Sequence, residues 1–298
     1  MTQTRRNPYI FIAISIINLS FAAIFVRLSN APFLIIGFYR LFFAVLILSP
    51  VFMYTKSWRK YYTIPKKTLL SIIAAGVLLA IHFGLWFVSL DYTSIASSMI
   101  LVDTNVIFIA ILAYILLKER LTHGRILGIM TAFIGVSIIA VTDWSNYTPI
   151  FGDILALISA IAFSFYLLLG RTVRQKLDLL PYVFLLYSSC AITFFFAALI
   201  WGFPFFSYDP NEYLIILGLA LIPTIFGHTL YNWALKYLEA TIVGVSLLAE
   251  PICSILLGIW ILGEIPSYLV IVGGALVLSG IYITARIKSK NEKVGKIE

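Results

Sequence analysis

Ten long apolar stretches are the feature that most restricts how this chain can fold. They cover residues 8–28, 32–53, 69–90, 94–117, 122–141, 151–170, 181–201, 213–235, 241–262 and 267–285. A helix needs about 20 mostly apolar residues to cross the hydrocarbon core of a bilayer. We therefore predict an all-α polytopic membrane protein with ten transmembrane helices. Only 11% of the residues are charged, whereas soluble domains carry about 25%, so an ordinary soluble enzyme is excluded.

The basic residues fall almost entirely on one side of this predicted topology. With the N-terminus in the cytoplasm, 19 of the 21 Lys and Arg residues lie in inside segments, and the exceptions are Arg27 and Arg40. Such a bias sets the orientation of membrane proteins. We expect a multi-pass protein of the plasma membrane with both termini, including a basic tail at 287–298, in the cytoplasm. The net charge of +8 is then a topology signal, and no nucleic-acid partner is expected.

The two halves of the chain repeat one another. A shift of 145 residues aligns residues 90–141 with 235–286 without a gap, and places Glu119 on Glu264, Gly128 on Gly273 and Gly135 on Gly280. The predicted repeats are residues 8–141 and 151–286. Each holds five helices, and because five is odd, the second repeat enters the membrane from the opposite side. Inverted repeats can adopt inward-open and outward-open states of similar energy, which is the geometry of alternating access in secondary transporters.

Leu117-Lys118-Glu119-Arg120 before Gly128 and Gly135 is repeated as Leu262-Gly263-Glu264 before Gly273 and Gly280. The sequence also contains Phe38-Tyr39-Arg40 in the second predicted span and Glu250-Pro251 in the ninth. These motifs resemble the tandem EamA domains of the drug/metabolite transporter superfamily. The resemblance covers almost the whole chain. It implies ten helices around a central cavity, and secondary transport, commonly export, of amino acids or similar small organic metabolites.

Other functions of the same fold stay open at this point. An uptake carrier or a lipid-linked flippase would use the same architecture, and a membrane-embedded enzyme or sensor is a third class. No ATP-binding P-loop and no common hydrolase motif is present in the sequence. Cys190 and Cys253 lie in apolar runs and are typical packing residues, so we expect neither a metal nor a cofactor.

Three charged residues fall inside the predicted spans, namely Arg40, Asp103 and Glu250. Charges at this depth are costly and commonly mark substrate or ion pathways. Arg40 and Asp103 lie at similar depth, so we expect an ion pair that is either structural or available to a zwitterionic substrate. Glu250 shares a helix face with Ser246 and Ser254 beside Pro251, and is the candidate for substrate binding or for coupling to protons. The alternative is a protonated Glu250 that only hydrogen-bonds a neighbouring helix.

The remaining candidates are polar and aromatic side chains within the spans. His82 and Trp86 share one helix face, and His228, Tyr231 and Asn232 share another; Asn18 and Tyr166 lie in the first helix of each repeat. Each could line the cavity or be a packing residue. The glycines at 128, 135, 273 and 280 are seven residues apart in each half and predict close helix packing. Glu119 and Glu264, near the interface, are expected to cap or pair locally.

Overall fold

The computed structural model describes residues 7–92, 98, 101–141, 150–250, 252–253, 256–257 and 268–286. Every regular element within these residues is helical. The elements are α1 (Pro8–Leu19), α2 (Ala22–Leu28), α3 (Phe33–Tyr54), η1 (Ser57–Tyr62), α4 (Lys66–Tyr92), α6 (Asn105–Leu117), α7 (His123–Val141), α8 (Ile150–Arg174), α9 (Leu179–Ile200), α10 (Pro210–Leu219), η2 (Ala220–His228), α11 (Thr229–Ala234), α12 (Ala240–Leu247) and α14 (Tyr268–Arg286). The expected tail at 287–298 lies outside the described residues.

Six helices in this part of the chain are long and apolar enough to cross a membrane. They are Pro8–Val26, Phe33–Tyr54, Lys66–Ser89, Ile150–Arg174, Leu179–Ile200 and Pro210–Ala234. The segments Leu101–Leu117, His123–Ile138 and Ile271–Arg286 are shorter apolar helices. The expected ninth span is represented by α12, and part of its remainder lies outside the described residues. The protein is thus an all-helical, multi-pass membrane protein.

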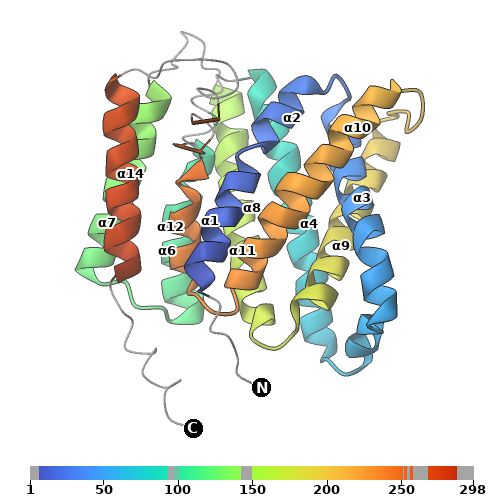
Figure 1. Ribbon diagram of the computed structural model, residues 1–298, viewed down its shortest axis with the longest axis horizontal. Helices are drawn as coiled ribbons and strands as arrows, with labels where there is room; N and C mark the ends of the chain where they lie inside the picture. The colour runs from blue at the N-terminus through green and yellow to red at the C-terminus, as the bar shows by residue number, and fades with distance from the viewer. Residues whose placement is uncertain are drawn as a thin grey trace.

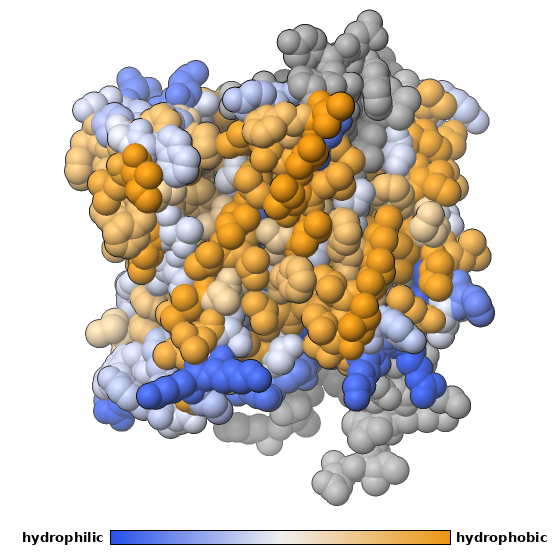
Figure 2. Space-filling view, turned by 180° about the vertical axis from the view of Figure 1, so that it is seen from behind, coloured by the Kyte–Doolittle hydropathy of each residue, from blue (hydrophilic) through white to orange (hydrophobic). Residues whose placement is uncertain are grey.

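The helices run side by side between two ends of the bundle (Figure 1). The most extensively packed helix pairs are α4 with α8, α3 with α9, and α7 with α14. The helices α7 and α14 form one edge of the molecule (Figure 1). Large apolar side chains remain exposed on the outside, including Leu46, Ile115 and Leu199 at 50–61% exposure. Figure 2 shows a broad apolar band across the middle of one face of the molecule. Such a band suits lipid, because soluble proteins rarely expose apolar patches of this extent.

The α7–α14 edge depends on glycine. A Cβ atom added at Gly128 would lie 2.8 Å from the carbonyl oxygen of Gly280, and one at Gly135 would lie 2.5 Å from that of Gly273. A side chain at either position would therefore push the two helices apart. The close packing predicted from the glycine spacing is confirmed.

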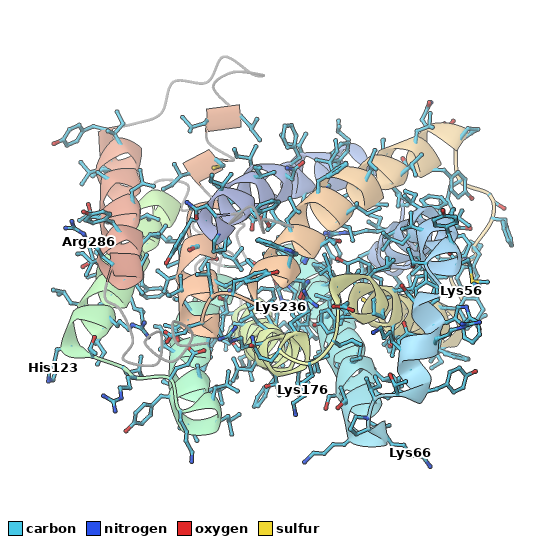
Figure 3. The ribbon with its side chains drawn as sticks, turned by 60° about the horizontal axis from the view of Figure 1, so that its bottom comes forward. Lys56, Lys66, His123, Lys176, Lys236 and Arg286 are labelled. Carbon is cyan, nitrogen blue, oxygen red and sulfur yellow. The ribbon has the colours of Figure 1, made fainter. Side chains whose placement is uncertain are left out.

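Basic side chains gather at one end of the bundle, which we call the basic end. Figure 3 views it from below and labels Lys56, Lys66, His123, Lys176, Lys236 and Arg286. The opposite end, which we call the far end, carries the segment between α2 and α3 and the segment that leads from α9 into α10 (Figure 1).

Candidate functional site

A cavity of about 100 Å³ lies between the helices of the two halves. It is lined by Leu19, Ala22, Arg40, His82, Phe83, Trp86, Val102, Asp103, Asn105, Phe163, His228, Tyr231, Leu247 and Glu250. All three charged residues singled out in the predicted spans are therefore at one site. His82, Trp86, His228 and Tyr231 join them, so the fold brings together seven of the twelve candidates.

Arg40 on α3 is held by two contacts. Its Nε donates to Thr224 Oγ1 at 2.8 Å, and its guanidinium carbon lies 4.5 Å from the centroid of the Phe83 ring. The expected Arg40–Asp103 ion pair is wrong, since the ion pairs among the described residues are Lys60–Asp178 and Arg125–Glu239. Matching depth did not place the two side chains together, because the guanidinium is engaged by the Thr224 hydroxyl and an aromatic face.

Thr224 owes its position to an irregular helix. Residues 220–228 form the π-helix η2, which contains Pro223. The Thr224 hydroxyl donates to the Leu219 carbonyl at 2.9 Å and accepts from Arg40. Single π-helical turns are rare and occur often at functional sites. The sequence analysis missed Thr224, although Pro223 inside an apolar span was a signal for a local departure from the α-helix.

Four buried polar atoms that belong to the cavity lining have no hydrogen-bond partner among the described residues. Two are donors, Arg40 Nη2 and Trp86 Nε1, and two are acceptors, Asp103 Oδ2 and Asn105 Oδ1. A buried polar group without a partner costs about 1–3 kcal/mol. Their concentration in one cavity indicates a place where a polar ligand or water completes the hydrogen bonding.

The two histidines of the lining are held by hydrogen bonds to other residues. His82 Nδ1 lies 2.9 Å from Ser159 Oγ, and His228 Nδ1 lies 2.9 Å from the Tyr231 hydroxyl. Tyr231 in turn shares a hydrogen bond of 2.5 Å with the hydroxyl of Tyr166. Asn232 Nδ2 donates to the same Tyr166 hydroxyl at 2.8 Å. Tyr166 and Asn232 are fully buried and stand one layer behind the cavity, where they fix Tyr231.

Asn18 and Ser246 do not belong to the lining. Asn18 Nδ2 donates to the Ile14 carbonyl at 2.7 Å, and Ser246 Oγ donates to the Ile242 carbonyl at 2.8 Å, so both bond their own helix. Ser254 and Pro251 lie outside the described residues.

The lining repeats itself across the two halves. The shift of 145 residues relates Asn105 to Glu250, Trp86 to Tyr231, Phe83 to His228 and Val102 to Leu247, and all eight line the cavity. Asn105 was missed in the sequence analysis. Its correspondence to Glu250 was the signal that could have found it.

Comparisons with known proteins agree with this architecture. The model of the EamA-like transporter family matches residues 7–141 and again residues 150–286. An uncharacterized transporter of Archaeoglobus fulgidus is 27% identical over 254 residues, which are 82% of this chain and 86% of that protein. The uncharacterized transporter YoaV of Bacillus subtilis is 20% identical over 89% of this chain and 91% of its own length. A solved crystal structure with 16% identity has a TM-score of 0.77 over 95% of this chain and 99% of that chain, which shows a common fold.

The helical bundle and these relatives together define a membrane transporter. The chain belongs to the EamA-like transporter family, which confirms the resemblance seen in the sequence motifs.

Proposed function

We propose that the protein is a secondary active transporter that exports amino acids or similar small organic metabolites across the plasma membrane by alternating access. The observation that carries this proposal is the cavity, whose wall has donors and acceptors without a hydrogen-bond partner among the described residues. A solute with both an anionic and a cationic group would complete these hydrogen bonds. Arg40 suits a carboxylate, since a guanidinium is a planar donor that matches carboxylate geometry. Asp103 and Glu250 suit an ammonium group.

Aromatic side chains suit the rest of such a solute. Phe83, Trp86 and Phe163 line the same cavity, and their faces would pack against an apolar side chain or a carbon skeleton. The polar atoms would then orient the solute, and the rings would contribute most of the buried apolar area.

Two features support alternating access through inverted repeats with ten membrane-spanning helices. The cavity contains four pairs of residues related by the repeat shift. The glycine contacts are also reciprocal: Gly128 meets Gly280, and Gly135 meets Gly273, where Gly273 and Gly280 are the repeat counterparts of Gly128 and Gly135. Reciprocal contacts of this kind arise between elements related by a two-fold axis. The charge bias supports cytoplasmic termini, with the basic end inside.

Protons are the proposed coupling ion, with Glu250 as their carrier. Glu250 lines the cavity near Arg40, and its backbone carbonyl accepts a hydrogen bond from Ser20 Oγ at 3.1 Å. A carboxyl group in the cavity is accessible from one side of the membrane and then from the other as the cavity opens to each side in turn. Glu250→Gln should abolish solute movement driven by a pH gradient while leaving solute exchange intact.

The test is transport into proteoliposomes with a panel of labelled amino acids, the matching amines and the matching carboxylic acids. Arg40→Gln should raise KM about 10–100-fold for solutes that carry a carboxylate, since a hydrogen bond to a charged group contributes about 1.5–3 kcal/mol. Amines should be far less affected. Asp178→Asn, in an exposed ion pair away from the cavity, is the matched control. Parental transport of every solute by Arg40→Gln and Asp103→Asn would contradict the proposal.

A further inference from the structure

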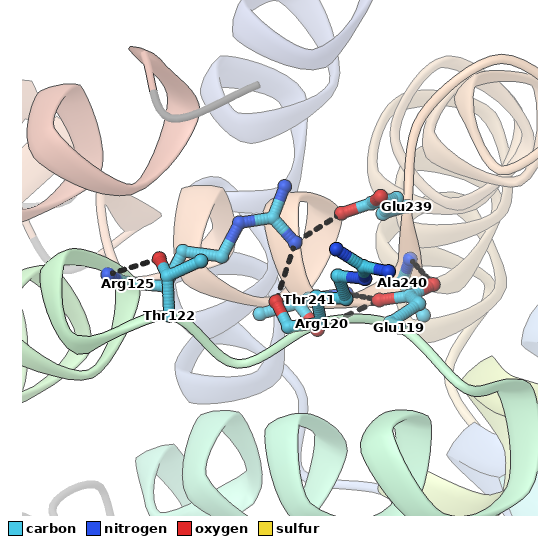
Figure 4. A network of polar contacts seen from close by, with 7 residues as sticks. All are labelled: Glu119, Arg120, Thr122, Arg125, Glu239, Ala240 and Thr241. Carbon is cyan, nitrogen blue, oxygen red and sulfur yellow. Dashed lines mark hydrogen bonds and ion pairs between the residues drawn. The ribbon is translucent and has the colours of Figure 1, made fainter. Parts of the chain in front are cut away.

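A buried polar cluster joins the two halves of the chain at the basic end. It connects the segment 118–122, between α6 and α7, to the start of α12 (Figure 4). The Glu119 carboxylate accepts from Ala240 N at 2.9 Å, from Thr241 N at 3.2 Å and from Thr241 Oγ1 at 2.8 Å. Glu119 thus caps the N-terminus of a helix that begins 121 residues later. The expectation that it acts locally is wrong, because the packing of the two halves brings the N–H groups at the start of α12 to its carboxylate.

An ion pair stands next to this cap. Arg125, at the start of α7, is 1% exposed and pairs with Glu239, the residue that directly precedes α12. Arg125 Nη1 also donates to the Arg120 carbonyl at 3.3 Å, and Arg125 N donates to Thr122 Oγ1 at the same distance. We call the Arg125–Glu239 ion pair the latch.

The latch is not repeated in the other half of the chain. By the shift of 145 residues, Glu119 corresponds to Glu264, an identical residue. Arg125 corresponds to Val270, and Glu239 corresponds to Ser94. The counterparts of the latch residues are uncharged, so they have no ion pair to form. The latch therefore breaks the symmetry of the two halves.

Asymmetry of this kind has a direct consequence for a transporter built from inverted repeats. If the halves were identical, the states open at either end would have equal free energy. Suppose that an interaction exists at just one end and forms when that end is closed. It then favours the closed state of that end by the free energy that is lost when the interaction breaks. If the basic end opens by movement of the 118–122 segment away from α12, the same movement separates Arg125 from Glu239.

On the basis of the proposed function, we propose that the Arg125–Glu239 ion pair holds the basic end closed and biases the resting protein toward the state whose cavity opens at the far end. The latch thus regulates which side of the membrane has access to the substrate cavity.

The test measures access to the cavity directly and requires no knowledge of the substrate. Val102→Cys, in a background with Cys190→Ala and Cys253→Ala, places one reactive thiol in the lining. A membrane-impermeant methanethiosulfonate reagent is applied from each side of sealed vesicles. Separate reporters at Ser57→Cys and Ser207→Cys identify the basic end and the far end.

The main variant replaces each latch residue by its repeat counterpart, Arg125→Val with Glu239→Ser. Both charges of the latch are removed together, so neither is left buried without the other. We expect the labelling rate from the basic end to rise about tenfold, and the rate from the far end to fall. A tenfold shift corresponds to about 1.4 kcal/mol of bias. Arg125→Lys keeps the charge and should label like the parent.

Asp178→Asn is the matched control for surface charge. The Lys60–Asp178 pair also joins the two halves, but its side chains are 57% and 66% exposed and 4.0 Å apart, so we expect no change in labelling. Size-exclusion chromatography of each variant establishes that it is folded. The double variant Arg125→Gln with Glu239→Gln provides a second uncharged replacement of the latch.

Each outcome bears on one proposal or on both. If a folded latch variant labels at parental rates from both ends, the latch is overturned and the proposed transport function is untouched. If the reporter is unreactive from both ends in every variant, the cavity is not on an access pathway, and both proposals fail.

Discussion

Each end of the bundle has a carboxylate that ties the first half of the chain to the second. At the basic end, Glu119 bonds the start of α12, and the latch stands beside it. At the far end, Glu212 on α10 accepts from Ser29 Oγ at 2.6 Å, from Asn30 N at 3.0 Å and from Asn30 Nδ2 at 3.2 Å. Both carboxylates are 8% exposed. The two carboxylates are equally buried, so any difference between the two ends must come from the residues that they contact.

The partners differ in charge and in access to water. Ala240 and Thr241 are fully buried, and the latch adds a cation and a second carboxylate. Asn30, by contrast, is exposed, so its amide groups can bond water when Glu212 moves away. Separating a buried ion pair costs more than exchanging the hydrogen bonds between a carboxylate and exposed neutral donors for hydrogen bonds to water. We therefore expect the contact at the far end to be the weaker of the two.

The largest effect should come from breaking the latch on one side only. Glu239→Gln leaves the buried Arg125 charge without its carboxylate, which costs about 3–5 kcal/mol in comparable buried pairs. Thermal unfolding in detergent, followed by tryptophan fluorescence, should show a large loss of stability. Adding Arg125→Gln should recover part of this loss. If the two losses simply add, the residues are not coupled and the basic end has no special strength.

A smaller effect should follow from weakening the cap. Glu119→Gln keeps the size of the side chain but removes the charge that accepts hydrogen bonds at the start of α12, which should cost about 1–2 kcal/mol. Thr241→Val removes only the hydroxyl donor and should cost about 1 kcal/mol. The same unfolding assay measures both. A Thr241→Val loss greater than that of Glu119→Gln would mean that the hydroxyl, and not the carboxylate, organises this joint.

The smallest effect should be at the far end. Glu212→Gln is the matched substitution there and should cost about 0.5–1 kcal/mol, since exposed Asn30 replaces the lost bonds with water. In the labelling assay, this variant should speed the reaction of the Val102→Cys reporter from the far end only. Should Glu212→Gln destabilise the protein more than Glu119→Gln, the order of strength of the two ends would be reversed.

The long spans could be predicted from hydropathy and charge, because each polar residue buried in lipid has a free-energy cost that does not depend on the rest of the fold. The same cost identified Arg40, Asp103 and Glu250, which do meet in one cavity. Their partners could not be read in this way. Thr224 reaches Arg40 through a π-helix that hydropathy does not register. The roles of the cavity residues in transport remain predictions.

Contacts between distant segments were the second limit. Glu119 and Arg125 look like ordinary interfacial residues when only their sequence neighbours are considered, and this is why a local role was expected for Glu119. Their partners in and before α12 become neighbours only when the two halves pack together. The repeat held part of the missing information, since it pairs Asn105 with Glu250 and shows the latch residues to be without charged counterparts.

The glycine edge between α7 and α14 also has a consequence for how the two halves assemble. Gly128 faces Gly280 and Gly135 faces Gly273, so each half offers the same strip to the other in the opposite direction. A surface that is complementary to itself can join two separate copies as readily as two parts of one polypeptide. The shape of the two glycine strips, and not the covalent link between the halves, is therefore what makes this edge self-complementary.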